Sequence, residues 1–350
     1  MSATCERAAE QVTRDLGFDC HDVSPVVSVR NPFDLAHWSM PLLELLIIAG
    51  AAWALVHAVR RYRAGDPISL ALWFAPLVYL FVTEPPLYFP EWFGLDDRYG
   101  FIFAHNLFTV QFMWDRLPLY IIAIYPAMTA LAYEVVRVLG VFRDRGAVAG
   151  AVAVAFVCQV FYEIFDHLGP TLGWWAWNDA NVQVNHPALE LVPMNSMLLF
   201  ASVSFGVLTW LVVRLTPGRR GWSLAWRVVV AGVLSPPAMA VAGIPSSLFG
   251  GDTPNLTAQA WVLGIELGLV WLAGAWILLG QVRRGAAPEG DATFARFYPA
   301  AYLVVMVVFW VVTVGDLGTG SVLYSAAALL GAAAVVAAVV ARRRVPAPTG

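Results

Sequence analysis

The chain has 350 residues, of which 59% are apolar and 13% are charged, and its formal net charge is −3. Its mean hydropathy is +0.68, whereas soluble domains carry about 25% charged residues. This composition excludes an ordinary soluble domain. It also gives no support to nucleic-acid binding, which calls for a strongly basic surface.

Nine apolar runs are each long enough to cross a bilayer, whose hydrocarbon core of about 30 Å requires about 20 helical residues. We therefore predict an all-α, polytopic membrane helix bundle in the cell membrane. A transmembrane domain over 38–341 follows an extracytoplasmic arm (1–37) and precedes a cytoplasmic tail (342–350). The expected spans are 39–59, 68–84, 117–136, 147–166, 191–213, 226–248, 258–280, 298–315 and 321–341.

The basic residues predict the orientation of this bundle, because cytoplasmic loops are enriched in Lys and Arg. All 21 basic residues are arginine, and most lie in alternate loops and at the C-terminus. The N-terminus is therefore predicted outside the cell and the C-terminus in the cytoplasm, as an odd number of spans requires. Anionic lipid headgroups account for the cytoplasmic arginines. The five arginines in the complementary segments are Arg7, Arg14, Arg30, Arg98 and Arg116.

The N-terminal arm is polar and acidic and lacks the apolar core of a secretory signal. Its two cysteines, Cys5 and Cys20, would pair on an oxidising face of the membrane or remain free thiols. The third cysteine, Cys158, lies within a predicted span and is interpreted as a packing residue.

The second span is predicted to end at Glu84, because Pro85 and Pro86 follow it directly. The next loop is aromatic and half apolar, so we expect it to lie in the membrane interface or to re-enter the membrane. Its notable polar groups are His105, Asn106, Asp115 and Arg116.

The stretch 161–195 gathers ionisable groups and indoles at a predicted membrane boundary. Glu163, Asp166 and His167 are spaced i, i+3 and i+4, so they share one side of a helix. A low dielectric favours the protonated form of a carboxyl, which keeps a proton available for general acid catalysis. Tryptophans alone are typical of an interface belt, whereas two carboxylates buried in a membrane favour a function.

A weak internal duplication relates this stretch to the first loop. Each unit runs from a carboxylate through a glycine and aromatics to a helix that restarts at a proline. The matched positions are Glu84, Gly100-Phe101 and Leu117-Pro118 in the first unit, and Glu163, Gly173-Trp174 and Val192-Pro193 in the second. Repeated helix–loop–helix units are a common way to build a membrane cavity.

The pattern E…LG…GxWxW…P…VP resembles the core of membrane carotenoid-biosynthesis proteins, the hydratase and lycopene-cyclase-like families. It is carried by Glu163, Leu168-Gly169, Gly173, Trp175, Trp177, Pro187 and Val192-Pro193. The resemblance implies that acidic residues on membrane helices protonate a polyene end. It also implies Glu163 as the general acid, Asp166 as its partner or base, and a substrate lined by Trp174, Trp175 and Trp177.

We therefore expect acid-catalysed cyclisation or hydration of a polyprenyl or carotenoid-like lipid by an integral membrane enzyme. The chain shows no nucleotide or dinucleotide fingerprint, so no such cofactor is expected, and the predicted partners are the lipid substrate and the bilayer. The candidate catalytic residues are Glu163, Asp166, His167 and Glu84. The candidate substrate-binding residues are Trp174, Trp175, Trp177, Asn178, His105, Asn195 and Glu266.

Two other classes remain open. A metal-dependent lipid hydrolase would use His105, His167 and His186 with nearby carboxylates, although the sequence holds no H-x-x-x-H pair. A transporter-like protein would line a pathway with Glu44, Glu266 and the proline-rich sixth span.

Overall fold

The computed structural model describes residues 5–285 and 288–342. Over these residues, nine helices are long and apolar enough to cross a membrane, which confirms the predicted all-α bundle. They correspond one to one to the predicted spans. They are α2 (Ser39–Arg63), α3 (Ile68–Tyr88), α5 (Leu119–Val138), α6 (Val141–Leu168), η2 with α8 (Ser196–Ser204 and Phe205–Leu215), α9 (Gly221–Ala242), α11 (Leu256–Arg283), α12 (Thr293–Thr313) and α13 (Thr319–Ala341).

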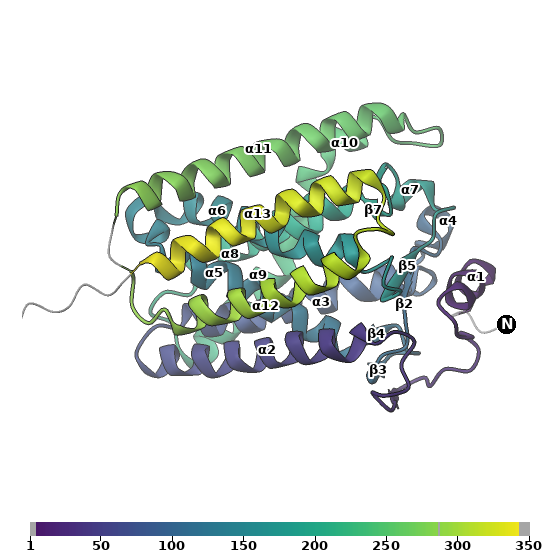
Figure 1. Ribbon diagram of the computed structural model, residues 1–350, viewed down its shortest axis with the longest axis horizontal. Coiled ribbons are helices and arrows are strands. Elements are labelled where there is room, and N and C mark those ends of the chain that lie inside the picture. Colours follow the sequence, from purple (N-terminus) through teal and green to yellow (C-terminus); the bar gives the residue numbers. More distant parts are fainter. Residues whose placement is uncertain (1–4, 286–287, 343–350) are drawn as a thin grey trace, which may run out of the picture.

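Helices α5 and α6 form the centre of the bundle. In each, 83% of the apolar stretch is buried inside the protein, compared with 22% in α11 and 28% in α9 and α13. The peripheral helices run alongside this central pair, with α11 at one edge (Figure 1). Their outward apolar faces suit a lipid environment, because a helix in a bilayer satisfies its own backbone and needs no polar surface.

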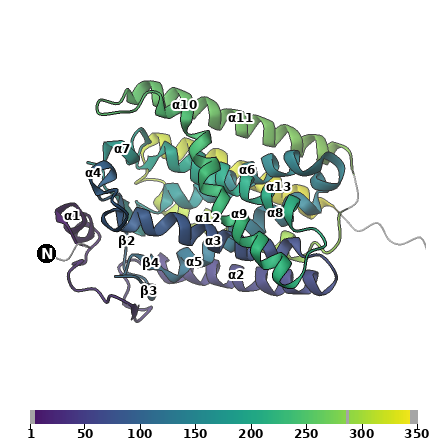
Figure 2. The same ribbon diagram turned by 180° about the vertical axis from the view of Figure 1, so that it is seen from behind.

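Short elements gather at one end of the bundle and form what we call the cap, residues 89–118 and 169–195 (Figures 1 and 2). Its two halves pair through antiparallel strands, so that Phe103 lies opposite Trp177 and His105 lies opposite Trp175. The elements of the cap are η1 (Pro90–Phe93), α4 (Asp96–Tyr99), β2 (Phe103–His105), β3 (Val110–Phe112), β4 (Leu117–Pro118), β5 (Trp175–Trp177), α7 (Val182–Asn185), β6 (Ala188–Leu189) and β7 (Val192–Pro193).

The strand pairing shows that the first loop folds into the cap against the second loop. Both loops contain a strand of the β2–β5 pair, and both end in a two-residue strand with proline, β4 or β7, before the next helix. The two matched units of the sequence thus face one another, while their common origin stays a prediction.

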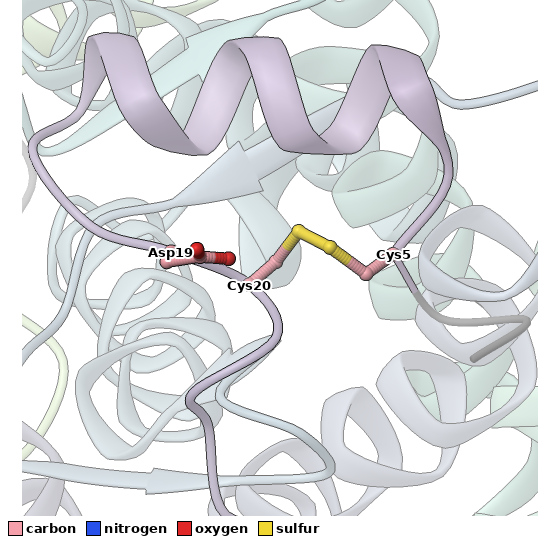
Figure 3. Close-up of side chains that lie close together, drawn as sticks. All are labelled: Cys5, Asp19 and Cys20. Carbon is pink, nitrogen blue, oxygen red and sulfur yellow. A yellow bond between two sulfur atoms is a disulfide. The ribbon is translucent and has the colours of Figure 1, made fainter. Parts of the chain in front are cut away.

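The N-terminal arm also belongs to this end of the molecule. Figure 3 shows that Cys5 and Cys20 form a disulfide, which settles the pairing that the sequence left open. The arm contains α1 (Arg7–Asp15), whose apolar side packs against Phe101 and Ala104 of the cap. It also contains β1 (Val27–Val29), which pairs with β3.

Several helix ends differ from the prediction at prolines, which do not end the helices where the sequence suggested. Helix α3 continues through Pro85 to Tyr88, as membrane helices do when neighbours satisfy the freed backbone groups. The third and fifth spans begin later than predicted, at Leu119 and Ser196, since the preceding residues extend into β4 and β7.

The sixth span ends at Ala242 rather than near residue 248. Pro236 and Pro237 lie inside α9, and the chain restarts as α10 (Ile244–Ser247) after Gly243. Of the predicted tail, all but Arg342 falls outside the described residues.

Candidate active site

A cavity of about 290 Å³ lies between the cap and the ends of α3, α5, α6 and η2. Its wall is mostly aliphatic and aromatic, with a few polar groups. This composition and size resemble small-molecule sites, which have volumes from about 300 Å³ upward and a handful of polar groups that fix orientation. Met239 closes one side from α9. A cavity of this kind suits an apolar ligand with one reactive position.

Six predicted site residues line this cavity. They come from distant parts of the chain, and the folding of the two loops into one cap brings them together. They are Glu84 from α3, His105 from β2, Asp166 from α6, Trp175 and Trp177 from β5, and Asn195 just before η2. The two indoles lie on the same side of β5 because alternate strand residues point the same way.

The other predicted residues lie elsewhere. Trp174 is fully buried and donates from Nε1 to Ser39 Oγ at 2.8 Å. Asn178 donates to the Phe101 carbonyl at 2.8 Å and so fastens the cap. Glu266 lies on the peripheral helix α11, away from the residues that line the cavity.

The predicted trio on α6 divides between two sides of its helix. Asp166 lines the cavity, whereas Glu163 and His167 lie outside its lining and form a pair, with 3.6 Å between His167 Nε2 and Glu163 Oε2. Consecutive helical residues are about 100° apart, so Asp166 and His167 cannot point in the same direction. The implied role of Glu163 as the acid that touches substrate is therefore not supported by this geometry.

Asp166 is nearly isolated in an apolar wall. Its exposed fraction is 2%, and the hydroxyl of Ser196 donates to Oδ2 at 3.4 Å, a long bond. Ser196 opens η2, a π-helical segment, and such wide turns occur frequently at functional sites. A weakly bonded, dry carboxyl is suited to hold a proton and deliver it to a ligand.

Glu84 has a different environment on the facing wall. The hydroxyl of Tyr125, one helix away on α5, donates to Glu84 Oε1. Hydroxyl donors stabilise a carboxylate more than a carboxylic acid. The hydrogen bond to Asp166 is long, whereas Glu84 accepts a close one from Tyr125. Different environments of this kind are the usual basis for one carboxyl acting as the acid, here Asp166, and the other as the base, here Glu84.

Tyr125 was missed from the sequence, as were Tyr162, Asn185 and Ser196, which also line the cavity. Tyr125 had one weak signal, a polar hydroxyl within an apolar run. The other residues gave none, since their role follows from which helices meet. The Trp175 ring is held close to α6 by Gly169, where a Cβ would lie 2.0 Å from that ring.

His105 is held between two tyrosines. Its Nε2 lies 3.2 Å from the Tyr88 hydroxyl, and its Nδ1 lies 3.4 Å from the Tyr120 hydroxyl. Burial lowers the pKa of His105 to about 3. The imidazole is therefore neutral in the folded protein at pH 5 to 8 and acts as a hydrogen-bonding bridge.

This lowered pKa predicts that acid destabilises the protein through His105. Between pH 6.5 and 3 the unfolded chain binds a proton that the folded protein does not, so stability is full above pH 6.5 and falls below it. The expected loss from pH 7 to pH 5 is about 2 kcal/mol. Unfolding midpoints of the wild type and His105→Gln at both pH values measure this. An equal loss in the two proteins would contradict the assignment.

The three histidines of the hydrolase alternative do not come together. His105 lies between its tyrosines, His167 Nδ1 is 2.9 Å from Ser321 Oγ, and His186 Nε2 is 3.0 Å from the Asp179 carbonyl. Across residues 5–285 and 288–342, no group of three potential ligands includes any of them.

One group of potential metal ligands does occur in the described part of the chain, Cys5, Asp19 and Cys20. Its two sulfurs are bonded to each other (Figure 3). Because the thiolate is the ligating form of cysteine, this oxidised pair is a structural link rather than a metal centre.

The whole chain was compared with known proteins. No family model matches it, no curated protein matches it, and no solved structure matches it. Its function therefore has to be argued from the chemistry of the cavity.

Proposed function

We propose that this protein is an integral membrane enzyme that cyclises or hydrates a neutral polyprenyl or carotenoid-like lipid by acid catalysis. The observation that carries the proposal is the pair of carboxyls, Asp166 and Glu84, on different helices around one aromatic cavity. The resemblance of the segment 163–193 to membrane carotenoid-biosynthesis proteins supports it, with Asp166 taking the acid role in place of Glu163.

The chemistry begins when Asp166 transfers its proton to one carbon of a substrate double bond. The neighbouring carbon becomes a cation, and the aromatic faces of Tyr162, Phe165 and Trp175 stabilise it. In cyclisation a second double bond attacks this cation, and Glu84 removes a proton to restore neutrality. In hydration a water molecule adds to the cation and loses its proton to Glu84.

The charge of the cavity favours a neutral substrate. No arginine lines it, the chain contains no lysine, and its one histidine is neutral. A diphosphate group would meet two carboxyls and no cation, and burying such a charge without a partner is very costly. A hydrocarbon end fits this wall.

The orientation is proposed from the arginine distribution, with the arm and the cap on the outer side. The Cys5–Cys20 disulfide supports this side, because disulfides persist in oxidising compartments and are rare in the cytosol. The cap carries the cavity, so the reaction would take place at the outer end of the bundle.

Expression in a host that makes lycopene and shorter polyprenyl lipids tests the proposal. Lipid extracts are profiled by mass spectrometry beside the Asp166→Asn variant. We expect a new isomer for a cyclase, or a product heavier by one water for a hydratase, that Asp166→Asn lacks. Asp252→Asn, at an exposed aspartate that does not line the cavity, is the matched control and should form product normally. An unchanged profile from well-folded protein would sink the proposal.

A further inference from the structure

A second polar cluster lies on α6 next to Asp166 but outside the lining of the cavity. Its central residue is Glu163, with an exposed fraction of 0%, and its neighbour His167 has one of 1%. Within the described part of the chain, neither carboxyl oxygen of Glu163 has a partner with good hydrogen-bond geometry, and the side chain of Gln159, one turn earlier on α6, is a polar neighbour. The proposed reaction does not use these two residues, so their burial needs another reason.

The absence of partners indicates which form of Glu163 is buried. A carboxylate sealed in an apolar interior without hydrogen bonds costs far more than a neutral carboxylic acid. The nearest cationic candidate, His167 Nε2, is 3.6 Å from Glu163 Oε2, beyond a normal hydrogen bond. A protonated Glu163 fits this site, which lies outside the lining of the cavity.

His167 connects this proton to the cap end of the bundle. Its other ring nitrogen, Nδ1, lies 2.9 Å from the hydroxyl of Ser321 in the first turn of α13. Next to Ser321, the backbone N–H of Gly320 donates to Oε1 of the exposed Glu190 at 2.9 Å. This end of α13 adjoins the cap (Figure 1). Ser321 itself is buried, so the chain of groups begins just inside the exposed start of α13.

At its inner end the chain reaches Asp166, three residues after Glu163 on the same helix. Residues spaced i and i+3 are neighbours on a helix, so the Asp166 and Glu163 carboxyls are close enough for their charges to interact. The other titratable groups around Glu163 are His167 and Tyr162 on α6 and Tyr324 on α13. From α11, Trp271 donates a hydrogen bond to the Tyr324 hydroxyl at 3.1 Å, and its indole does not titrate.

We infer that Ser321, His167 and Glu163 form a proton path from the cap end of α13 to Asp166, which returns Asp166 to its acid form after each turnover. The purpose of this path rests on the proposed function. The existence of the path rests on the geometry alone. His167 and Glu163 are then relay residues that act through Asp166, because they do not touch the substrate.

Each step moves one proton and no electrons. Asp166, left as a carboxylate, takes the proton from the O–H of Glu163. Glu163 regains one from Nε2 of His167, once a small side-chain movement shortens their 3.6 Å separation to a hydrogen bond, while Nδ1 of the ring takes one from the Ser321 hydroxyl. Ser321 is reprotonated by hydronium that reaches it from the exposed start of α13, and His167, now protonated on Nδ1, returns to its Nε2–H tautomer by exchanging protons with water there. Glu84 releases the proton that it took from the substrate, so one proton enters and one leaves in each turnover. A neutral imidazole can donate from one nitrogen and accept at the other, which suits it to this position.

The existence of the path is tested without any substrate. The full chain is purified and transferred to D₂O, and infrared spectroscopy follows the carboxylic C=O band that disappears in Glu163→Gln. We expect hydrogen exchange at this band to slow by about tenfold or more in Ser321→Ala, as loss of a proton-transfer partner does. Ser321→Thr, which keeps the hydroxyl, should exchange like the wild type.

Ser202→Ala is the matched control, because Ser202 is equally buried and lies outside the path. Equal exchange rates in Ser321→Ala and the wild type would overturn the path, as would the absence of any carboxylic band that Glu163→Gln removes. If exchange slows as expected and no lipid product is ever found, the path stands and the proposed function fails. If a product is found, Ser321→Ala should lower kcat, leave the single-turnover rate unchanged, and be rescued by Ser321→Thr.

Discussion

Product formation by Asp166→Asn is expected to fall by about 10²- to 10⁴-fold, the usual contribution of a general acid. Asparagine has nearly the same shape as aspartate and can still accept the hydrogen bond from Ser196, which holds Asp166 at 3.4 Å. It has no acidic proton to give to a double bond. The loss should therefore appear in the rate of product formation, with the unfolding midpoint of the purified protein close to that of the wild type.

Glu163→Gln is the informative comparison for this prediction. Glu163 is as buried as Asp166, has the same chemistry, and lies on the same helix, yet it does not line the cavity. In a single-turnover measurement Glu163→Gln should form product at close to the wild-type rate, while Asp166→Asn should not. If Glu163→Gln lost product formation and Asp166→Asn kept it, Glu163 would be the general acid. The proposal that Asp166, and not Glu163, faces the substrate would then be wrong.

The membrane bundle could be predicted from the sequence because hydropathy is a local property. An apolar run of 20 residues has few alternatives to a spanning helix, and each predicted span is a helix in the structure. Some of the errors lie near prolines, at Tyr88, Ser196 and Ala242. Others have no proline beside them: α6, α9 and α12 begin five or six residues before the predicted spans. Whether a proline ends a helix depends on the neighbouring groups that satisfy the freed carbonyls, and those neighbours are set by tertiary packing.

The candidate site was predictable in composition but not in arrangement. Glu84, Asp166 and Trp175 were found because a carboxylate or an indole cluster at a membrane boundary is conspicuous in the sequence. The separation of Asp166 from Glu163 depends on which helices cover each side of α6. Tyr125 could not be recognised as a site residue from the sequence, because its partner Glu84 is 41 residues away in the chain and only the packing of α5 beside α3 brings the two together.

The structural roles of the arginines at the other end of the bundle could not be predicted from the sequence either. Their distribution was explained by orientation alone, but Arg137 is fully buried in α5 and makes structural contacts. Its guanidinium donates to the carbonyls of Glu289 and Asp291, in the linker between α11 and α12. This contact fastens the linker to the central helix.

Glu134→Leu is accordingly expected to destabilise the protein by about 3–5 kcal/mol, the cost of leaving buried charges without their partner. Glu134 is 1% exposed and accepts from Arg137 Nε at 2.7 Å and from the Ser69 hydroxyl at 2.6 Å. His57 Nε2 lies 3.2 Å from its Oε2. Leucine removes the one carboxylate around which these groups are arranged, and nothing else described in the cluster can replace it.

The free energy of unfolding in detergent, measured for Glu134→Leu, Arg137→Leu and the double variant, tests whether the charges stabilise each other. The double variant should lose less than the two single losses added together, with a coupling of about 0.5–3 kcal/mol, because it leaves no lone charge buried. Glu10→Gln breaks the exposed pair with Arg14 and serves as the control, with an expected loss of at most about 1 kcal/mol. Strictly additive losses would mean that Glu134 and Arg137 are held by their separate surroundings. The linker contact would then not depend on the carboxylate, and Arg137 would hold the linker through its bonds to the carbonyls of Glu289 and Asp291 alone.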